Sequence, residues 1–171
     1  IYFVDMDLEG NIVTYHVLDD SPNVTTVSSG RKFIQTLDGH FALSYPKWVT
    51  DTDVDVFLLK FTKEGEVLWE KQFGFEGIDG VGEIINTQDG GFLMAGFAST
   101  INHSEMYAVK TASRGILEWE NPYCFNTSCI ALSVEATLDG GYILGGQGKV
   151  ADNNYDIYIV KINSLGNKKW E

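Results

Sequence analysis

The chain has 171 residues, of which 44% are hydrophobic and 21% are charged, a composition typical of a folded domain and not of a disordered segment. Its formal charge of −12 argues against nucleic acid as a partner, because only 12 Lys and Arg residues stand against 24 acidic residues. No stretch approaches the roughly 20 apolar residues of a membrane-spanning helix, so we expect no membrane insertion.

Two kinds of segment alternate along the whole chain, and each predicts a β-hairpin. The first kind turns at a glycine, and these glycines are Gly10, Gly65, Gly115 and Gly166. The second kind turns at an Asp-Gly pair, which we expect to form a two-residue type I′ turn. The aspartates of these pairs are Asp38, Asp89 and Asp139. Runs rich in β-branched and aromatic residues flank the turns, as in VFLLKF from Val56.

The turn glycines are spaced by 55, 50 and 51 residues, so a repeat of about 50 residues covers the chain. We expect one domain with units at 1–55, 56–105 and 106–156 and a half unit at 157–171. Each unit supplies four antiparallel strands, and a four-stranded sheet with two apolar faces must pack against copies of itself. This favours β-propeller blades over a β-sandwich or a β-solenoid.

About three and a half blades do not close a ring, since propellers have roughly 4 to 8 blades. We therefore expect a fragment of a larger propeller, with the remaining blades supplied by the same protein or by copies of this chain.

Three aspartates alternate in the connector DTDVD, at Asp51, Asp53 and Asp55. Oxygen ligands at alternate positions are typical of calcium loops, so this connector is the candidate metal site and calcium the only candidate cofactor. A solvated loop without a cation explains the same residues.

A tryptophan follows the turn glycine by four residues in three of the units, at Trp69, Trp119 and Trp170. Recurrence at one repeat position favours packing between blades over a sugar-binding platform. Thr14 stands at this position in the first unit, so docking there should be weaker or displaced.

Cys124 and Cys129 are the only cysteines, and they are either two free thiols or a disulfide closing a small loop. A zinc site is not expected, because no histidine lies near them in the sequence. Asn23, Asn102 and Asn126 each begin an Asn-X-Ser/Thr glycosylation sequence in an expected loop. These sequences favour an extracellular location and therefore the disulfide.

The alternation of DGGYILGG with DIYIVKINSLGNKKWE resembles a repeat found in many secreted and surface proteins of bacteria and archaea, written loosely DGGYILAGYT, a loop, then DIYLVKTDSNGNxxW. Its second half is similar to the tryptophan-docking repeat of quinoprotein propellers. The resemblance covers almost the full chain and implies a propeller fold, but propellers host unrelated functions.

We therefore expect a non-catalytic extracellular or cell-surface module that serves as a scaffold, an adhesion surface or an assembly surface, with a surface glycan or a protein as a possible ligand. One alternative is part of a quinoprotein-like or carbohydrate-active enzyme; another is a filament subunit joined by strand pairing. Nucleophile elbows, phosphate loops and dinucleotide fingerprints are absent, so no catalytic or cofactor-binding residue is predicted.

Overall fold

The computed structural model describes residues 1–18, 31–99, 103–124, 128–151 and 154–171. Every regular element in these ranges is a β-strand, which confirms the all-β expectation. No helix in the same ranges has the length and apolar character needed to cross a membrane.

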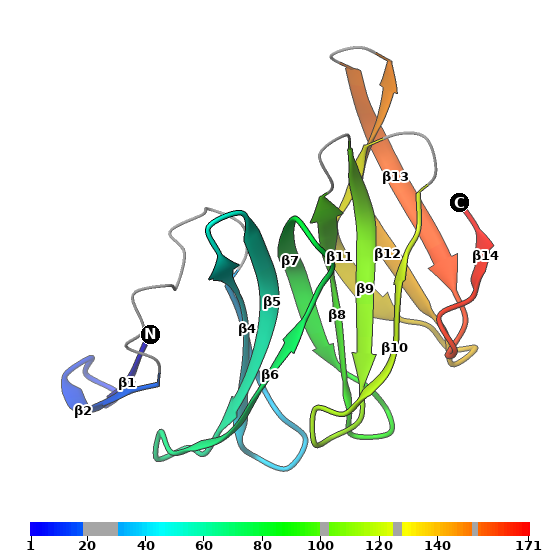
Figure 1. Cartoon of the computed structure of the whole chain (residues 1–171). Coiled ribbons are helices and arrows are strands. Elements are labelled where there is room, and N and C mark those ends of the chain that lie inside the picture. Colours follow the sequence, from blue (N-terminus) through cyan, green and yellow to red (C-terminus); the bar gives the residue numbers. More distant parts are fainter. Residues whose placement is uncertain (19–30, 100–102, 125–127, 152–153) are drawn as a thin grey trace.

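In chain order the strands form a hairpin and three groups of four, of which the first two are joined into one eight-stranded sheet; Figure 1 shows the arrangement. The N-terminal hairpin consists of β1 (Tyr2–Met6) and β2 (Ile12–Val17). Sheet I consists of β3 (Lys32–Gln35), β4 (Phe41–Thr50), β5 (Asp53–Phe61) and β6 (Val67–Phe73). Sheet II consists of β7 (Ile78–Asn86), β8 (Phe92–Ser99), β9 (Ser104–Thr111) and β10 (Leu117–Pro122). Sheet III consists of β11 (Cys129–Ala136), β12 (Tyr142–Ala151), β13 (Asn154–Ile162) and β14 (Lys168–Trp170).

Consecutive strands pair antiparallel within the hairpin and within each sheet. One parallel pair, Val54 with Ile78, connects sheet I to sheet II. Each sheet begins with an Asp-Gly hairpin and ends with the Gly-turn hairpin that follows it. A sheet therefore combines the second half of one sequence unit with the first half of the next.

The Asp-Gly turns differ from the expected two-residue type I′ geometry. The Gly39 N–H donates to the Thr36 carbonyl at 3.0 Å, and the Thr36 N–H donates to the His40 carbonyl at 2.9 Å. The loop thus has three residues, with Leu37 and Asp38 in front of a left-handed glycine at φ +83°. The Gly-turn hairpins close with the same pair of bonds.

Alternate residues of a central strand face opposite neighbouring layers, which gives the inner sheets two apolar faces. In β9, Met106 and Ala108 join a buried cluster with sheet III, whereas Tyr107 and Val109 join a buried cluster with sheet I. A third cluster fills the space between the N-terminal hairpin and the other face of sheet I. Layer packing of this kind is the main apolar burial of the fold.

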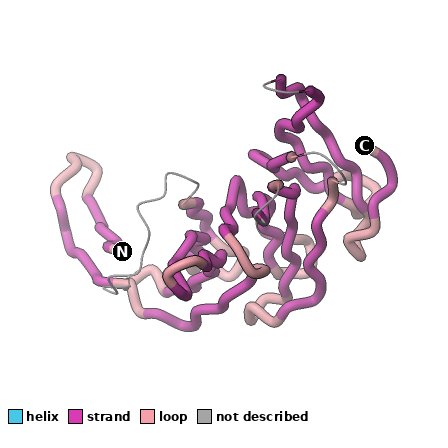
Figure 2. Tube along the Cα trace, turned by 45° about the horizontal axis from the view of Figure 1, so that its top comes forward, coloured by secondary structure: helices cyan, strands magenta, loops and turns pink. Residues whose placement is uncertain are grey.

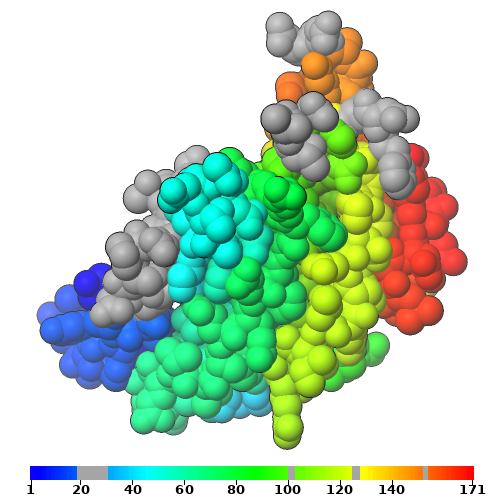
Figure 3. All heavy atoms as spheres, viewed as in Figure 1, coloured from blue at the N-terminus to red at the C-terminus, as the bar shows by residue number. Residues whose placement is uncertain are grey.

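The layers stand side by side in chain order, with the N-terminal hairpin at one end and sheet III at the other (Figures 1 and 2). The two ends occupy opposite sides of the molecular surface (Figure 3). Among the described strands, none from sheet III pairs with the N-terminal hairpin. The observed architecture is an open series of packed antiparallel sheets.

Candidate functional site

A side chain from one layer lies against the turn glycine of the next layer at each junction between described layers. A Cβ atom on Gly115 would lie 2.8 Å from the Trp69 ring, and one on Gly166 would lie 2.8 Å from the Trp119 ring. These distances are too short for any real Cβ contact, so the two tryptophans occupy space that only glycine leaves open. Both tryptophans are half-buried at the junctions between sheets.

Hydrogen bonds reinforce the junction between sheets II and III. The Trp119 Nε1–H donates to the Ser164 carbonyl at 3.0 Å, and the Tyr123 hydroxyl donates to the Gly166 carbonyl at 2.9 Å. Both acceptors belong to the Gly-turn loop of sheet III. The contact therefore combines an aromatic ring over a glycine with bonds to the loop backbone.

The first junction uses a different side chain. A Cβ atom on Gly65 would overlap the ring of His16, which pairs with Phe3 across the N-terminal hairpin. His16 stands two residues beyond Thr14 and so on the same face of β2. The ring of Phe3 continues this contact, with centroids 5.3 Å from Phe61. Docking of the first unit is thus displaced along the strand.

In each sheet, a salt bridge between a lysine and an aspartate connects the two hairpins. Lys60 contacts Asp38 at 2.6 Å, and Lys110 contacts Asp89 at 2.8 Å. The third pair is Lys161 with Asp139 at 2.9 Å. In each case the lysine lies on the third strand and the aspartate in the Asp-Gly turn of the same sheet.

These contacts lower the pKa of the turn aspartates. Desolvation raises the pKa of Asp89, but hydrogen bonds from Lys110 and Thr87 outweigh it and hold the value at about 2. Hydrogen bonds from Thr137 and Lys161 lower the pKa of Asp139. The aspartates therefore stay ionised and paired at neutral pH, which fixes the turn against the strand.

Sequence reasoning did not identify these lysines as structural. Each lysine follows a run of apolar residues, as in YAVK, and a lysine in a strand is ordinarily expected to face solvent. The signal that could have found them is their recurrence five residues before the turn glycine, at Lys60, Lys110 and Lys161.

The three aspartates of the candidate calcium connector face different partners. Asp51 lies exposed in the turn between β4 and β5. An Asp53 oxygen accepts from the Gly77 N–H at 2.9 Å, and an Asp55 oxygen accepts from the Gln72 side chain at 2.6 Å. Within the described parts of the chain, no three His, Cys, Asp or Glu side chains gather in a way that could hold a metal ion.

Asp55 instead faces Asp79 across the link between sheets I and II. A Cβ atom on Gly74 would overlap a carboxylate oxygen of each aspartate, so these two oxygens are close neighbours. Asp79 is 1% exposed, and one of its oxygens accepts from the Phe75 N–H at 2.7 Å. Its other oxygen has no hydrogen-bond partner among the described residues.

Burial raises the pKa of Asp79 to about 7, with a further contribution from the neighbouring Asp55 carboxylate. Burial also raises the pKa of Asp55, against the hydrogen bond from Gln72. An open pocket of about 200 Å³ lies beside Asp79, between Phe75 and Glu105. The sequence around Asp79, IDGVGEI, offers no motif that would single it out.

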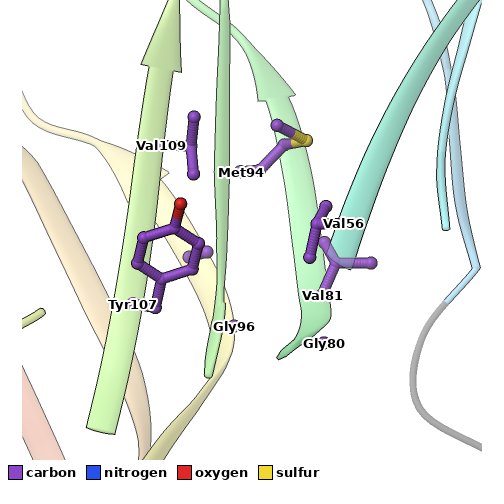
Figure 4. A pocket seen from close by; sticks show the side chains of 8 residues that line it. Val56, Gly80, Val81, Met94, Gly96, Tyr107 and Val109 are labelled. Carbon is purple, nitrogen blue, oxygen red and sulfur yellow. The ribbon is translucent and has the colours of Figure 1, made fainter. Parts of the chain in front are cut away.

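A small cavity lies in the interior between sheets I and II. The cavity there measures about 10 Å³ and lies among Val56, Val81, Met94 and Tyr107 (Figure 4). A volume of this size is near the lower limit for a single water molecule.

Cys124 and Cys129 form a disulfide, with Cα atoms 6.4 Å apart and both side chains buried at the junction of sheets II and III. The Met106 N–H approaches the Cys129 sulfur at 3.2 Å. The candidate glycosylation residues Asn23, Asn102 and Asn126 lie outside the described residues.

The two end layers expose apolar faces that the inner layers bury. On sheet III, Ile157 is 79% exposed, Ile159 is 41% exposed and Trp170 is 52% exposed. On the N-terminal hairpin, Tyr2 is 70% exposed and Val4 is 43% exposed. Apolar groups aligned on one face of a sheet are typical of an interaction surface.

Comparison with known protein families found no family model that matches this chain, and comparison with curated proteins found no match either.

Proposed function

We propose that this chain is a non-catalytic scaffold or assembly module, built from β-propeller blades, in a secreted or cell-surface protein. The proposal rests on one repeated contact: at each junction between described layers, a tryptophan or histidine ring packs on the turn glycine of the next layer. The two end layers expose the apolar faces that would form further contacts of this kind. When each repeat unit buries its apolar faces against neighbouring units, the array can grow by the addition of further units. Its partners would be further blades, copies of this chain, or a glycan or protein bound by the loops.

The disulfide and the charge support an extracellular location. Disulfides such as Cys124–Cys129 persist in oxidising compartments and are rare in the cytosol. A net charge of −12 favours solubility at high concentration and attracts divalent cations, among them calcium.

The geometry favours a scaffold over the quinoprotein-like or carbohydrate-active alternative. Glycoside hydrolysis needs two carboxylates that face a substrate cleft. Asp79 and Glu105 border the same pocket, but Asp79 is enclosed and bound to the Phe75 backbone. The raised pKa of Asp79 follows from burial at a sheet junction, which needs no substrate.

The proposal is tested by adding one repeat unit to the chain. A second copy of residues 121–171 is joined after Glu171, which continues the repeat in register. We expect the added sheet to cover Trp170, so that acrylamide quenches its fluorescence much less than in the original chain. Subtracting the matched Trp170→Phe protein isolates the Trp170 signal in each case.

The matched control is the same extended chain with the added copy of Gly166 changed to Val. That side chain would occupy the space of the docked ring, so Trp170 should stay accessible to acrylamide. Equal quenching of Trp170 in the original chain, the extended chain and the control would reject the proposed array of packed repeat units.

A further inference from the structure

We propose that copies of this chain bind one another head to tail, with the outer face of sheet III in one copy against the N-terminal hairpin of the next. Trp170 would then lie on the Gly10 turn. This inference rests on the proposed function and names the partner of the open ends as a second copy.

The two end faces are the two halves of a junction that the chain already contains. Ile157 and Ile159 occupy the repeat positions of Met106 and Ala108, which are fully buried under sheet III. Tyr2 and Val4 occupy the positions of Tyr107 and Val109, which are buried against sheet I. Each exposed set is therefore the counterpart of a set that is covered elsewhere.

The turn glycines show the same complementarity. Gly10 closes its turn as the others do, with its N–H donating to the Asp7 carbonyl at 3.1 Å and φ at +87°. A Cβ atom on Gly10 would meet no described atom within 4 Å, whereas those on Gly65, Gly115 and Gly166 would meet a ring of the preceding layer. Trp170 is the docking tryptophan without such a glycine among the described residues.

The second copy fits these faces better than an unrelated apolar partner. At the junction between sheets II and III the receiving layer presents an Ile-Tyr-X-Val stretch with a left-handed glycine nine residues after its isoleucine, and residues 1–10 repeat both features at the same offset. The N-terminal hairpin is half a sheet, so the contact area is smaller than at an internal junction. We therefore expect weak association, with Kd of about 10 μM to 1 mM.

Because the two faces differ, the contact is heterologous and generates rings or open chains. This property permits a complementation test. Ile157→Lys places a charge on the sheet III face, and Tyr2→Lys places a charge on the hairpin face. Leu138→Lys is the matched control, since Leu138 is fully exposed on the Asp-Gly turn of sheet III and not on β13, β14 or the N-terminal hairpin.

Sedimentation equilibrium of the whole chain, up to about 1 mM, measures the average mass. We expect wild type and Leu138→Lys to associate to the same extent, and each face variant alone to stay monomeric. A mixture of the two face variants in equal amounts should form a dimer, because each contributes its intact face. The dimer cannot grow, since its outer faces carry the charges.

A monomeric wild type at the highest concentration, or a monomeric mixture, would overturn the inference. Face variants that associate as strongly as wild type would also overturn it and would point to pairing of strand edges. If a face variant does not fold by circular dichroism, Trp170→Ala and Tyr15→Lys test the same faces. A monomeric wild type whose Trp170 is still covered in the extended chain would reject the head-to-tail contact and leave the proposed scaffold intact.

Discussion

Trp119 and Trp170 occupy the same position of the repeat but have different surroundings. Each pairs with a lysine on the neighbouring strand of its own sheet, Lys110 and Lys161 respectively. Trp119 lies under the next layer and donates to Ser164, whereas Trp170 is 52% exposed on the last sheet. The difference shows that the next layer supplies the further burial and the hydrogen bond that Trp119 has and Trp170 lacks among the described residues.

The same comparison explains why these sheets occur in series. A sheet with two apolar faces pairs most of its backbone internally but needs neighbouring sheets to cover both faces. Removing a contact at an inner junction should therefore lower the free energy of unfolding much more than the same substitution in an end layer.

Truncating the two tryptophans should give the largest contrast. We expect Trp119→Ala to lower the free energy of unfolding by about 3 kcal/mol, because it leaves a cavity and loses the bond to Ser164. Trp170→Ala should cost less than about 1 kcal/mol, since the ring is half in solvent. Urea denaturation at a concentration where the chain is monomeric measures both, and similar losses would contradict the comparison.

Alanine at the turn glycines separates backbone strain from docking. Gly10→Ala introduces only the strain of a left-handed residue, about 1 kcal/mol. Gly166→Ala adds a clash with the Trp119 ring, so its total cost should be about 3 kcal/mol. Thermal and urea unfolding of the two variants would show the gap; equal costs would mean that the ring moves aside freely.

The Asp55–Asp79 pair should make stability depend on pH. The folded-state pKa of Asp79 is about 7, above that of the unfolded chain, so the folded state binds the extra proton between about pH 4 and pH 7. Its contribution is present at acid pH and is lost as the pH rises through about 7.

Asp79→Asn removes this dependence. We expect the variant to be more stable than wild type by about 2 kcal/mol at pH 8 and to have a flatter stability profile between about pH 5 and pH 8. Unfolding free energies across that range provide the measurement, and an unchanged profile would show that Asp79 titrates normally. Asp51→Asn is the control, because Asp51 is exposed.

Removing the lysine of a lysine–aspartate salt bridge should have the smallest effect on the free energy of unfolding. Lys110→Met leaves Asp89 without its partner, and we expect a loss of about 1 kcal/mol at neutral pH, because Asp89 is half exposed. The folded-state pKa of Asp89 is lowered to about 2, so the loss should fade as the pH drops from about 4 to 2. Lys161→Met at the open end should cost less, and acid unfolding curves of both variants test the order.

The repeat, the hairpins and the all-β class could be predicted because each unit carries the same short-range pattern. Glycine turns flanked by alternating apolar residues specify hairpins locally, without knowledge of any partner. The turn geometry was predicted wrongly because the Asp-Gly pair also fits a three-residue loop. There Thr36 donates its hydroxyl to Asp38 at 2.5 Å, a bond that a turn rule for the dipeptide alone does not consider.

The contacts between layers depend on partners that are distant in sequence, so less of them was predictable. His16 takes the role of the docking tryptophan two residues beyond the repeat position, which Thr14 occupies. No sequence pattern predicts its contact with Gly65. Asp55 and Asp79 are separated in the chain and meet beside Gly74, next to the parallel pair Val54–Ile78. The alternation of Asp51, Asp53 and Asp55 predicts a shared cation; in the structure Asp51 lies in the turn before β5, whereas Asp53 and Asp55 lie on that strand.

Hydrogen exchange of the indole Nε1–H groups tests the repeated, open-ended junction most directly. With the protein monomeric and uniformly labelled with nitrogen-15, the Trp119 indole should be strongly protected because it donates to Ser164 across the junction. The Trp170 indole should exchange nearly as fast as in an unfolded chain. Equal protection of the two indoles, or fast exchange at Trp119, would contradict the account.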